Sequence, residues 1–340
     1  MVRAMAVLLV AMVAGLGVAV DGTAAPGPAE ADALAPAQQA YEQNLALGRS
    51  LDGGAATEEQ AAEAERLFEA ALSGAQAEVR ADPRSGEAHV LAGMVLCTGY
   101  RSVSVAKGEA GGTITVLRAG GSQCEEGLAE IRAAMRLAPT RPEYGLDYAR
   151  ALQACGKPDD GRREALALWD RRGGMSGEQC AECALVLADL AGQSGDKGGE
   201  AGWLRRRLDF APHDMAMATR LIGAMAGQPQ AAWLPYTTGK ELAAREKKPM
   251  IIVVVSSQCG WCRKLEQETL TNARVVACCK DCVCSQVTVE DEPGFARALG
   301  VRSFPQTIVV SASGNETGRI MGYVAADRYL AELDRLRQIE

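Results

Sequence analysis

The segment IIVVVSSQCGWC, residues 251–262, decides the fold of the second half of the chain. Its first five residues are branched and apolar, which predicts a strand buried on both faces. Cys259 follows this strand where a helix is expected to begin, and Cys262 lies three residues later on the same helix face. Unpaired N–H groups and the helix dipole favour the thiolate of Cys259. Cys262 can close a disulfide with it, so the pattern predicts a redox-active dithiol.

Around this motif, apolar runs and turn residues alternate in a way that predicts one α/β domain over residues 233–340. From the first strand onward the expected order is βαβαββα. The predicted elements are helices at 239–247, 260–278, 293–299 and from 325 onward, and strands at 250–255, 283–289, 306–310 and 319–323.

Three segments carry a resemblance to a known family: IIVVVSSQCGWCRKLEQETLTNARVV, VRSFPQTIVV and SGNETGRIMGY, in this order. Residues 248–337 resemble the thioredoxin superfamily, especially extracytoplasmic disulfide-reductase-like domains. The resemblance implies a thiol–disulfide oxidoreductase in which Cys259 attacks, Cys262 resolves the mixed disulfide, and a cis Pro305 holds the substrate chain. It implies no cofactor beyond the redox-active disulfide. The implied active-site neighbours are Gly260, Trp261 and Phe304.

Two positions depart from the family pattern. Thioredoxins commonly carry a buried acid on the strand before the motif, where this chain has Val253. Proton transfer to Cys262 would then need water or another group. The pair Gly260-Trp261 replaces Gly-Pro and adds apolar surface beside Cys259. The sequence does not decide whether the domain oxidises or reduces its clients, because the family spans about 150 mV in potential.

Residues 58–228 show a helical pattern with breakers at near-regular intervals, at Pro139, Gly173-Gly174 and Pro212. A two-helix period of roughly 34 residues is typical of a tetratricopeptide (TPR) array. The fold class expected for the chain is therefore multidomain: a helical-hairpin repeat array followed by a thioredoxin-fold domain. An irregular helical domain without true repeats is the alternative. Either arrangement offers a surface for a protein partner.

An insertion at 99–123 is expected to form a β-hairpin. Cys97 closes the helix before the insertion and Cys124 opens the helix after it. Antiparallel neighbours bring these ends together, which predicts a Cys97–Cys124 disulfide. Cys155 is then left as the unpaired cysteine of an odd total of eleven.

A second group of cysteines lies where the active-site helix is expected to meet the next strand. A structural or secondary redox disulfide, with Cys279–Cys282 as the local pair, is one interpretation. Copper(I) or zinc binding by closely spaced thiolates is another, and surface thiols without a role are the third. We call this group the cysteine corner; its members are Cys278, Cys279, Cys282 and Cys284.

The other thiols and the histidines fit structural roles better than catalytic ones. Cys180 and Cys183 share the Cys-x-x-Cys spacing but lie on a predicted helix with no strand before it. A structural bond or packed thiols is the expectation there, with a redox pair as the alternative. His89 and His213 are far from Cys259 in sequence, so a Cys–His hydrolase is not supported.

The N-terminus is typical of an export signal. Arg3 precedes the apolar run 4–20 and the small residues 23–25, which predicts a signal peptide over residues 1–25 and a periplasmic or secreted protein. An uncleaved anchor is the alternative. Residues 26–57 are rich in Ala, Pro and Gly and are expected to form a linker with a weak first helix. The net charge of −7 gives no support for a nucleic-acid partner.

Two functions therefore remain open. The first is an exported thiol–disulfide oxidoreductase that acts on protein cysteines, with the helical repeats binding the partner. The second is a non-catalytic assembly protein or a soft-metal carrier that uses the cysteine corner.

Overall fold

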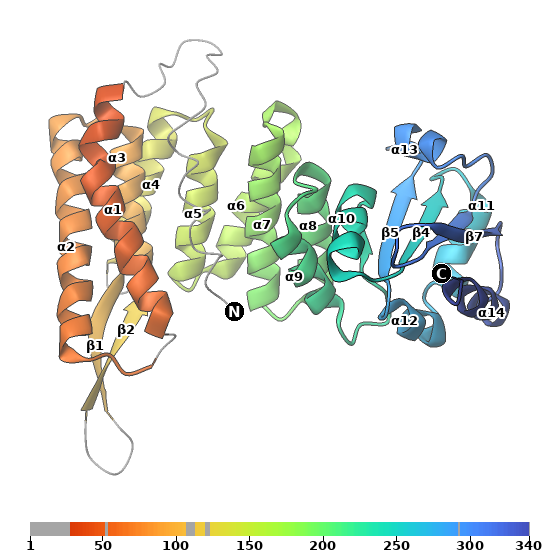
Figure 1. Ribbon diagram of the computed structural model, residues 1–340. Coiled ribbons are helices and arrows are strands. Elements are labelled where there is room, and N and C mark those ends of the chain that lie inside the picture. Colours follow the sequence, from red (N-terminus) through yellow and green to blue (C-terminus); the bar gives the residue numbers. More distant parts are fainter. Residues whose placement is uncertain (1–27, 52–53, 107–112, 120–122, 292, 340) are drawn as a thin grey trace. The chain divides into compact units, whose positions relative to one another are not determined.

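The computed structural model describes residues 28–51, 54–106, 113–119, 123–291 and 293–339. The chain divides into two compact units between Arg171 and Arg172, and each is described by itself (Figure 1). The predicted signal peptide at 1–25 lies outside the described residues. No helix in the described part of the chain is long and apolar enough to span a membrane.

The first unit is built from antiparallel helices and one β-hairpin. Its helices begin at residues suited to that position: Thr57 caps one in a capping box with Gln60, Ser85 caps the next, and Pro142 and Pro158 open two others. The elements are α1 (Pro28–Leu51), α2 (Glu58–Ala81), α3 (Gly86–Thr98), β1 (Tyr100–Ala106), β2 (Thr113–Ala119), α4 (Cys124–Leu137), α5 (Pro142–Ala154) and α6 (Pro158–Asp170).

Helix α1 occupies most of the segment that was expected to be a linker. It is longer than its composition predicts because its Ala37, Ala40 and Tyr41 side chains pack into a core shared with α2 and α3. The Asn44 side chain is buried and bonds the backbone of Tyr100 through both its amide and its oxygen. Tertiary packing and a satisfied polar group thus stabilise this helix.

The expected β-hairpin is present. Strands β1 and β2 pair antiparallel, with Val103 opposite Val116 and Tyr100 opposite Ala119. The Glu65 carboxylate on α2 accepts hydrogen bonds from the Ser102 N–H and hydroxyl, at 2.8 and 3.0 Å. These bonds attach the hairpin to the helices beside it.

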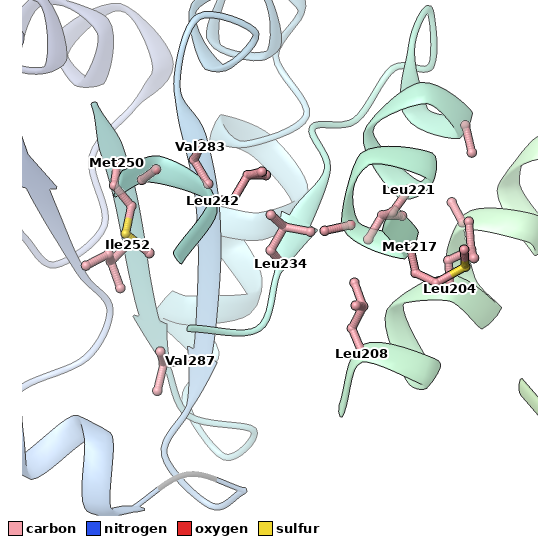
Figure 2. Close-up of a cluster of buried hydrophobic side chains, with 14 of the residues drawn as sticks. Leu204, Leu208, Met217, Leu221, Leu234, Leu242, Met250, Ile252, Val283 and Val287 are labelled. Carbon is pink, nitrogen blue, oxygen red and sulfur yellow. The ribbon is translucent and has the colours of Figure 1, made fainter. Parts of the chain in front are cut away.

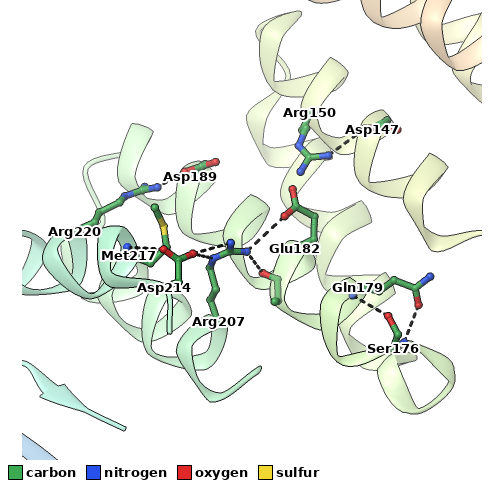
Figure 3. A network of polar contacts seen from close by, with 11 residues as sticks. Asp147, Arg150, Ser176, Gln179, Glu182, Asp189, Arg207, Asp214, Met217 and Arg220 are labelled. Atoms are coloured by element: carbon green, nitrogen blue, oxygen red, sulfur yellow. Dashed lines mark hydrogen bonds and ion pairs between the residues drawn. The ribbon is translucent and has the colours of Figure 1, made fainter. Parts of the chain in front are cut away.

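The second unit begins with three helices, which a polar network holds together (Figure 3). Arg207 on the second helix forms an ion pair with Asp214, 2.9 Å away, whose other oxygen caps the third helix. The same guanidinium reaches Glu182 on the first helix at 3.5 Å. These helices are α7 (Gly177–Gln193), α8 (Lys197–Phe210) and α9 (Met215–Met225), preceded by the 3₁₀ turn Arg172–Gly174.

A five-stranded mixed sheet follows, in the order β3-β5-β4-β6-β7. Strand β4 is central, parallel to β5 and antiparallel to β6, as the predicted βαβαββα order requires. The two-residue strand β3 was not predicted. The remaining elements are β3 (Trp233–Leu234), α10 (Tyr236–Glu246), β4 (Met250–Val255), α11 (Gly260–Lys264), α12 (Ala273–Cys279), β5 (Val283–Thr288), α13 (Pro293–Ala298), β6 (Gln306–Val310), β7 (Glu316–Met321) and α14 (Ala326–Arg337).

Strand β4 divides the core of this unit into two clusters, because alternate side chains point to opposite faces. Ile251, Val253 and Val255 face the cluster that holds Cys262 and α14. On the other face, Met250 and Ile252 join a cluster that continues into α8 and α9 (Figure 2). The compact unit therefore includes α7–α9 and starts before residue 233, the predicted start of the thioredoxin-like domain.

Candidate active site

Cys259 lies between strand β4 and helix α11, where the sequence places it. Its sulfur caps the helix by accepting a hydrogen bond from the Cys262 N–H at 3.2 Å. The side chain is partly exposed, and its sulfur lies 3.7 Å from the Phe304 carbonyl oxygen. A sulfur in this position can accept hydrogen bonds from the unpaired N–H groups at the helix N-terminus.

Glu290 fixes the turn that presents Cys259. Its carboxylate accepts from the Ser256 hydroxyl at 2.6 Å and from the Ser257 N–H at 3.1 Å. The hydrogen bond from Ser256 lowers the pKa of Glu290. Arg263 closes the other side by donating to the Ser257 carbonyl at 3.0 Å. Sequence reasoning missed Glu290, which lies 34 residues after Ser256.

Cys262 is the sheltered member of the pair, with only 1% of its surface exposed. Burial raises the pKa of its thiol to about 12, and the hydrogen bond with Cys259 adds to this shift. At neutral pH one partly exposed sulfur thus stands beside one protonated, buried thiol. This is the asymmetry that attack followed by resolution requires.

A carboxylate follows Cys262 along the helical segment, whereas strand β4 carries none. Val253 is fully buried among apolar side chains, as the sequence predicts. Glu266, one turn after Cys262, accepts a hydrogen bond from the Gln286 amide at 2.8 Å. Its negative charge is one of the weaker causes that raise the Cys262 pKa, after burial and the bond with Cys259. The four-residue spacing from Cys262 was the available signal for Glu266.

Pro305 follows a cis peptide bond from Phe304, as the resemblance implies. Its carbonyl accepts from the Gly322 N–H at 2.8 Å, which ties the loop to the end of β7. Phe304 packs against both core clusters. The loop therefore has a fixed position beside the Cys259 sulfur.

Trp261 forms an exposed apolar surface next to the dithiol, with 61% of its area open to solvent. Its ring lies 5.8 Å from that of Tyr323, and the Lys264 ammonium sits 4.7 Å from the Tyr323 ring centre. The Tyr323 hydroxyl donates to Glu268 at 2.7 Å. Met321 is also exposed, at 55%.

Comparisons with known proteins agree with this geometry. Residues 238–337 match the family model described as a thioredoxin-like domain. These residues form a thioredoxin-like domain. The match covers less than a third of the chain, and no curated protein matches the chain.

Solved structures resemble separate parts of the chain. A DsbH oxidoreductase is 17% identical, with a TM-score of 0.30, over 33% of this chain and 87% of its own. A thioredoxin from Thermus thermophilus is 24% identical, with a TM-score of 0.29, over 31% and 85%. A thermophilic TPR protein, also from Thermus thermophilus, is 18% identical, with a TM-score of 0.37, over 58% and 99%.

The helix after the dithiol is interrupted, whereas the sequence predicts one continuous helix to residue 278. A π-helical turn, Leu265–Thr269, follows α11, and α12 starts afresh after Asn272. The buried Thr269 hydroxyl donates to the Val324 carbonyl at 2.7 Å. This bond to a distant segment fixes the residue at which the first helix ends. The turn positions Glu266 and Glu268 within the thioredoxin-like domain.

At the cysteine corner the predicted Cys279–Cys282 disulfide is absent, and all four thiols are free. The Cys284 thiol instead donates to the Cys279 backbone carbonyl at 3.8 Å. A separate contact between the Cys284 and Cys279 side chains lowers the pKa of Cys279. Arg337 donates to the Cys278 sulfur at 3.0 Å. No three of the corner sulfurs lie within 4.8 Å of one another.

The predicted Cys97–Cys124 disulfide is wrong: Cys124 is bonded to Cys155, and Cys97 is a free, buried thiol. The helix ends do meet, as antiparallel packing predicts, with the Cys97 sulfur 3.8 Å from the Cys124 carbonyl oxygen. A third helix, α5, ends at the same place and brings Cys155 to Cys124. Cys155 is therefore not the unpaired cysteine.

The remaining candidates are structural. Cys180 and Cys183 form no disulfide and are buried on α7, which agrees with packed thiols. His89 lies beside Glu130 at 2.5 Å, in the first unit. His213 is an exposed residue 2.6 Å from Glu241.

Proposed function

We propose that the protein is a thiol–disulfide oxidoreductase that acts on cysteines of other polypeptides. The observation that carries this proposal is the position of the Cys259 sulfur: it caps helix α11, faces the Phe304 carbonyl, and has the buried Cys262 as its neighbour. Cys259 is partly exposed and forms no disulfide, so its sulfur is accessible to a partner.

The exchange proceeds in two displacements. The Cys259 thiolate attacks a partner disulfide, forms a mixed disulfide with one partner sulfur and releases the other as a thiolate. Cys262 then loses its proton and attacks Cys259, which releases the second partner sulfur and leaves a Cys259–Cys262 disulfide. Two electrons pass from the domain to the partner, and the reverse sequence oxidises a partner dithiol.

Cys262 needs a proton acceptor for the second displacement, because burial holds its pKa near 12. Water is one candidate. Glu266 is the other, since it follows Cys262 by one helical turn and is oriented by Gln286 on β5. We assign to Glu266 the proton transfer with Cys262 that a buried acid at position 253 would otherwise perform.

The surroundings of Cys259 favour an extended partner chain with an apolar side chain near its cysteine. Trp261 and Met321 are exposed beside the site, and large exposed apolar surfaces mark binding regions. The fixed Phe304-Pro305 loop lies along the Cys259 sulfur, where it can align the partner backbone. The helical hairpins of the first unit are proposed to bind the partner at a further surface.

We also place this activity outside the cytoplasm. The basic residue, apolar run and small residues of segment 1–25 are typical of an export signal, and disulfides such as Cys124–Cys155 persist in oxidising compartments. Cell fractionation with N-terminal sequencing tests this part. A cytosolic chain that retains its first residues would contradict it.

Trapping experiments test the exchange mechanism. The full chain carrying Cys262→Ser should accumulate covalent mixed disulfides with client proteins, because nothing then resolves the bond at Cys259. The variant Cys259→Ser should form none, and Cys180→Ser, which alters a buried thiol on α7, should behave like the unaltered chain. Equal trapping by the Cys259→Ser and Cys262→Ser variants would refute the mechanism and favour the non-catalytic assembly protein.

A further inference from the structure

The cysteine corner lies at the opposite end of the central strands from the dithiol. Cys284 on β5 is paired with Ile251 near the start of β4, whereas Cys259 follows the end of that strand. Cys279 is the last residue of α12, and a hydrogen bond from the Cys282 N–H to its carbonyl, at 3.2 Å, closes the turn into β5. The proposed exchange reaction uses none of the corner thiols.

Two of the corner thiols, Cys279 and Cys284, contact each other through their side chains. The Cys284 sulfur also lies 3.8 Å from the Cys279 carbonyl oxygen. Both side chains are buried, with 5% and 3% of their surface exposed, in the core cluster that also holds Cys262. Since no three corner sulfurs lie within 4.8 Å of one another, this contact joins a pair and not a larger cluster.

The two sulfurs of this pair differ in how readily they lose a proton. The hydrogen bond with Cys284 lowers the pKa of Cys279, and the Arg337 charge adds to this effect against burial. The same hydrogen bond, followed by burial, raises the pKa of Cys284 well above its ordinary value. Burial also raises the pKa values of Cys278 and Cys282. Cys279 is therefore the corner sulfur that most readily forms the thiolate, which is the form that oxidants modify.

The burial of Cys279 decides which oxidants can reach it. A disulfide of a partner protein has to bring one of its sulfurs up to the attacking thiolate, and a side chain with 5% exposure does not offer that space. Hydrogen peroxide is a small neutral molecule and needs far less room. Cys278, which precedes Cys279 and is partly exposed, marks the side on which the corner meets solvent.

We propose that Cys279 and Cys284 form a second redox site, which hydrogen peroxide converts into a disulfide. The Cys279 thiolate attacks one peroxide oxygen, which gives a sulfenic acid and releases hydroxide; the hydroxide takes up the proton that Cys279 has lost. The Cys284 thiol then attacks the sulfenic sulfur, forms the Cys279–Cys284 bond and releases water. Two thiols lose two electrons and two protons, and the peroxide becomes two water molecules. A dithiol reductant reverses the change.

Peptide mapping of the full chain tests the proposal. Trypsin cleaves after Lys280, which lies between the first two corner cysteines and the last two. After treatment with hydrogen peroxide and blocking with N-ethylmaleimide, mass spectrometry should find the two peptides linked, with fragment ions that place the bond between Cys279 and Cys284. Dithiothreitol should separate them. A link through Cys278 or Cys282, or no link at all, would overturn the proposal.

Variants assign the two roles within the pair. The parent chain carries Cys259→Ser and Cys262→Ser, so the outcome does not depend on the proposed exchange activity. Cys284→Ser should lose the link and leave Cys279 as a sulfenic acid that dimedone labels, with an unchanged circular dichroism spectrum. Cys282→Ser is the matched control and should form the link as its parent does. Dimedone on another corner thiol instead would show that Cys279 is not the sulfur that peroxide attacks and would overturn the proposal.

Discussion

Two segments of the second unit share the Cys-x-x-Cys spacing and differ in where the helix begins. Cys180 and Cys183 lie inside α7, and the Cys180 N–H is already bonded to the Ser176 carbonyl at 2.9 Å. Cys259 lies just before α11, so the Cys262 N–H is free to bond its sulfur. The difference teaches that spacing alone makes two sulfurs neighbours. The helix start is what sets Cys259, the proposed nucleophile, apart from Cys180.

The largest expected effect separates these two segments directly. In dithiothreitol-driven insulin reduction, Cys259→Ser should reduce the rate to that of dithiothreitol alone, because the attacking sulfur is lost. Cys180→Ser should keep the parent rate. A parent rate in Cys259→Ser, or a comparable loss in Cys180→Ser, would contradict the distinction between the two segments.

The pH dependence of resolution sharpens the comparison further. Burial raises the pKa of Cys262 to about 12, so its thiolate fraction should rise about tenfold per pH unit from pH 7 to 9. Release of thionitrobenzoate from a mixed disulfide on Cys259 measures this step. In the Glu266→Gln variant, where only the thiolate route remains, its rate should increase roughly a hundredfold over that range. If the pKa of Cys262 were not raised, the release rate would instead begin to level off near pH 9.

Two controls make that profile specific. Cys262→Ser should release no thionitrobenzoate at any of these pH values. Burial also raises the pKa of Cys180, yet Cys180→Ser should leave the profile unchanged because that thiol has no part in the step. A plateau below pH 9 in the unaltered chain would show that the folded protein does not hold Cys262 protonated.

Sequence patterns predicted the positions of Cys259 and Cys262 well, because the determinants of these positions are local. Five branched apolar residues before Cys259 specify a buried strand, and the spacing to Cys262 specifies one helix face. The cis peptide before Pro305 came from the family resemblance. Each of these features depends on residues adjacent in the chain or on a motif of fixed order.

The features that were missed depend on contacts between distant segments. Cys124 has two sulfurs within reach at the meeting point of three helix ends, and the sequence does not say which one forms the bond. The π-helical turn depends on the bond from Thr269 to Val324, 55 residues later. The apolar faces of α8 and α9 pack on the sheet, although nothing in their composition distinguishes them from the other helices of residues 58–228.

Substitution of Glu266 tests whether this residue is the proton acceptor for Cys262. We propose no such acceptor for Cys180. Glu266→Gln should slow thionitrobenzoate release about tenfold at pH 7 by removing the base. The same change should lower the pKa of Cys262, since the Glu266 charge helps to raise it. A slower rate together with a lower pKa is the signature of a proton acceptor.

The matched control for that variant is Glu268→Gln. This residue lies on the same π-helical turn but is exposed and bonded to Tyr323. It should leave the release rate within about twofold of the parent, since screened surface charges have small effects. A faster release in Glu266→Gln would show that Glu266 only opposes the thiolate, and water would then be the acceptor.

The smallest expected effect comes from substitution in the second Cys-x-x-Cys, formed by Cys180 and Cys183. Cys183 is fully buried on α7, where its thiol packs as a small apolar group. Cys183→Ser replaces it with a more polar hydroxyl and should lower the free energy of unfolding by about 1–2 kcal/mol, as measured by urea denaturation. Insulin reduction should not change. If Cys183→Ser instead lost insulin-reduction activity at unchanged stability, Cys180 and Cys183 would form a second redox site. A redox Cys-x-x-Cys would then not need to lie at the start of a helix.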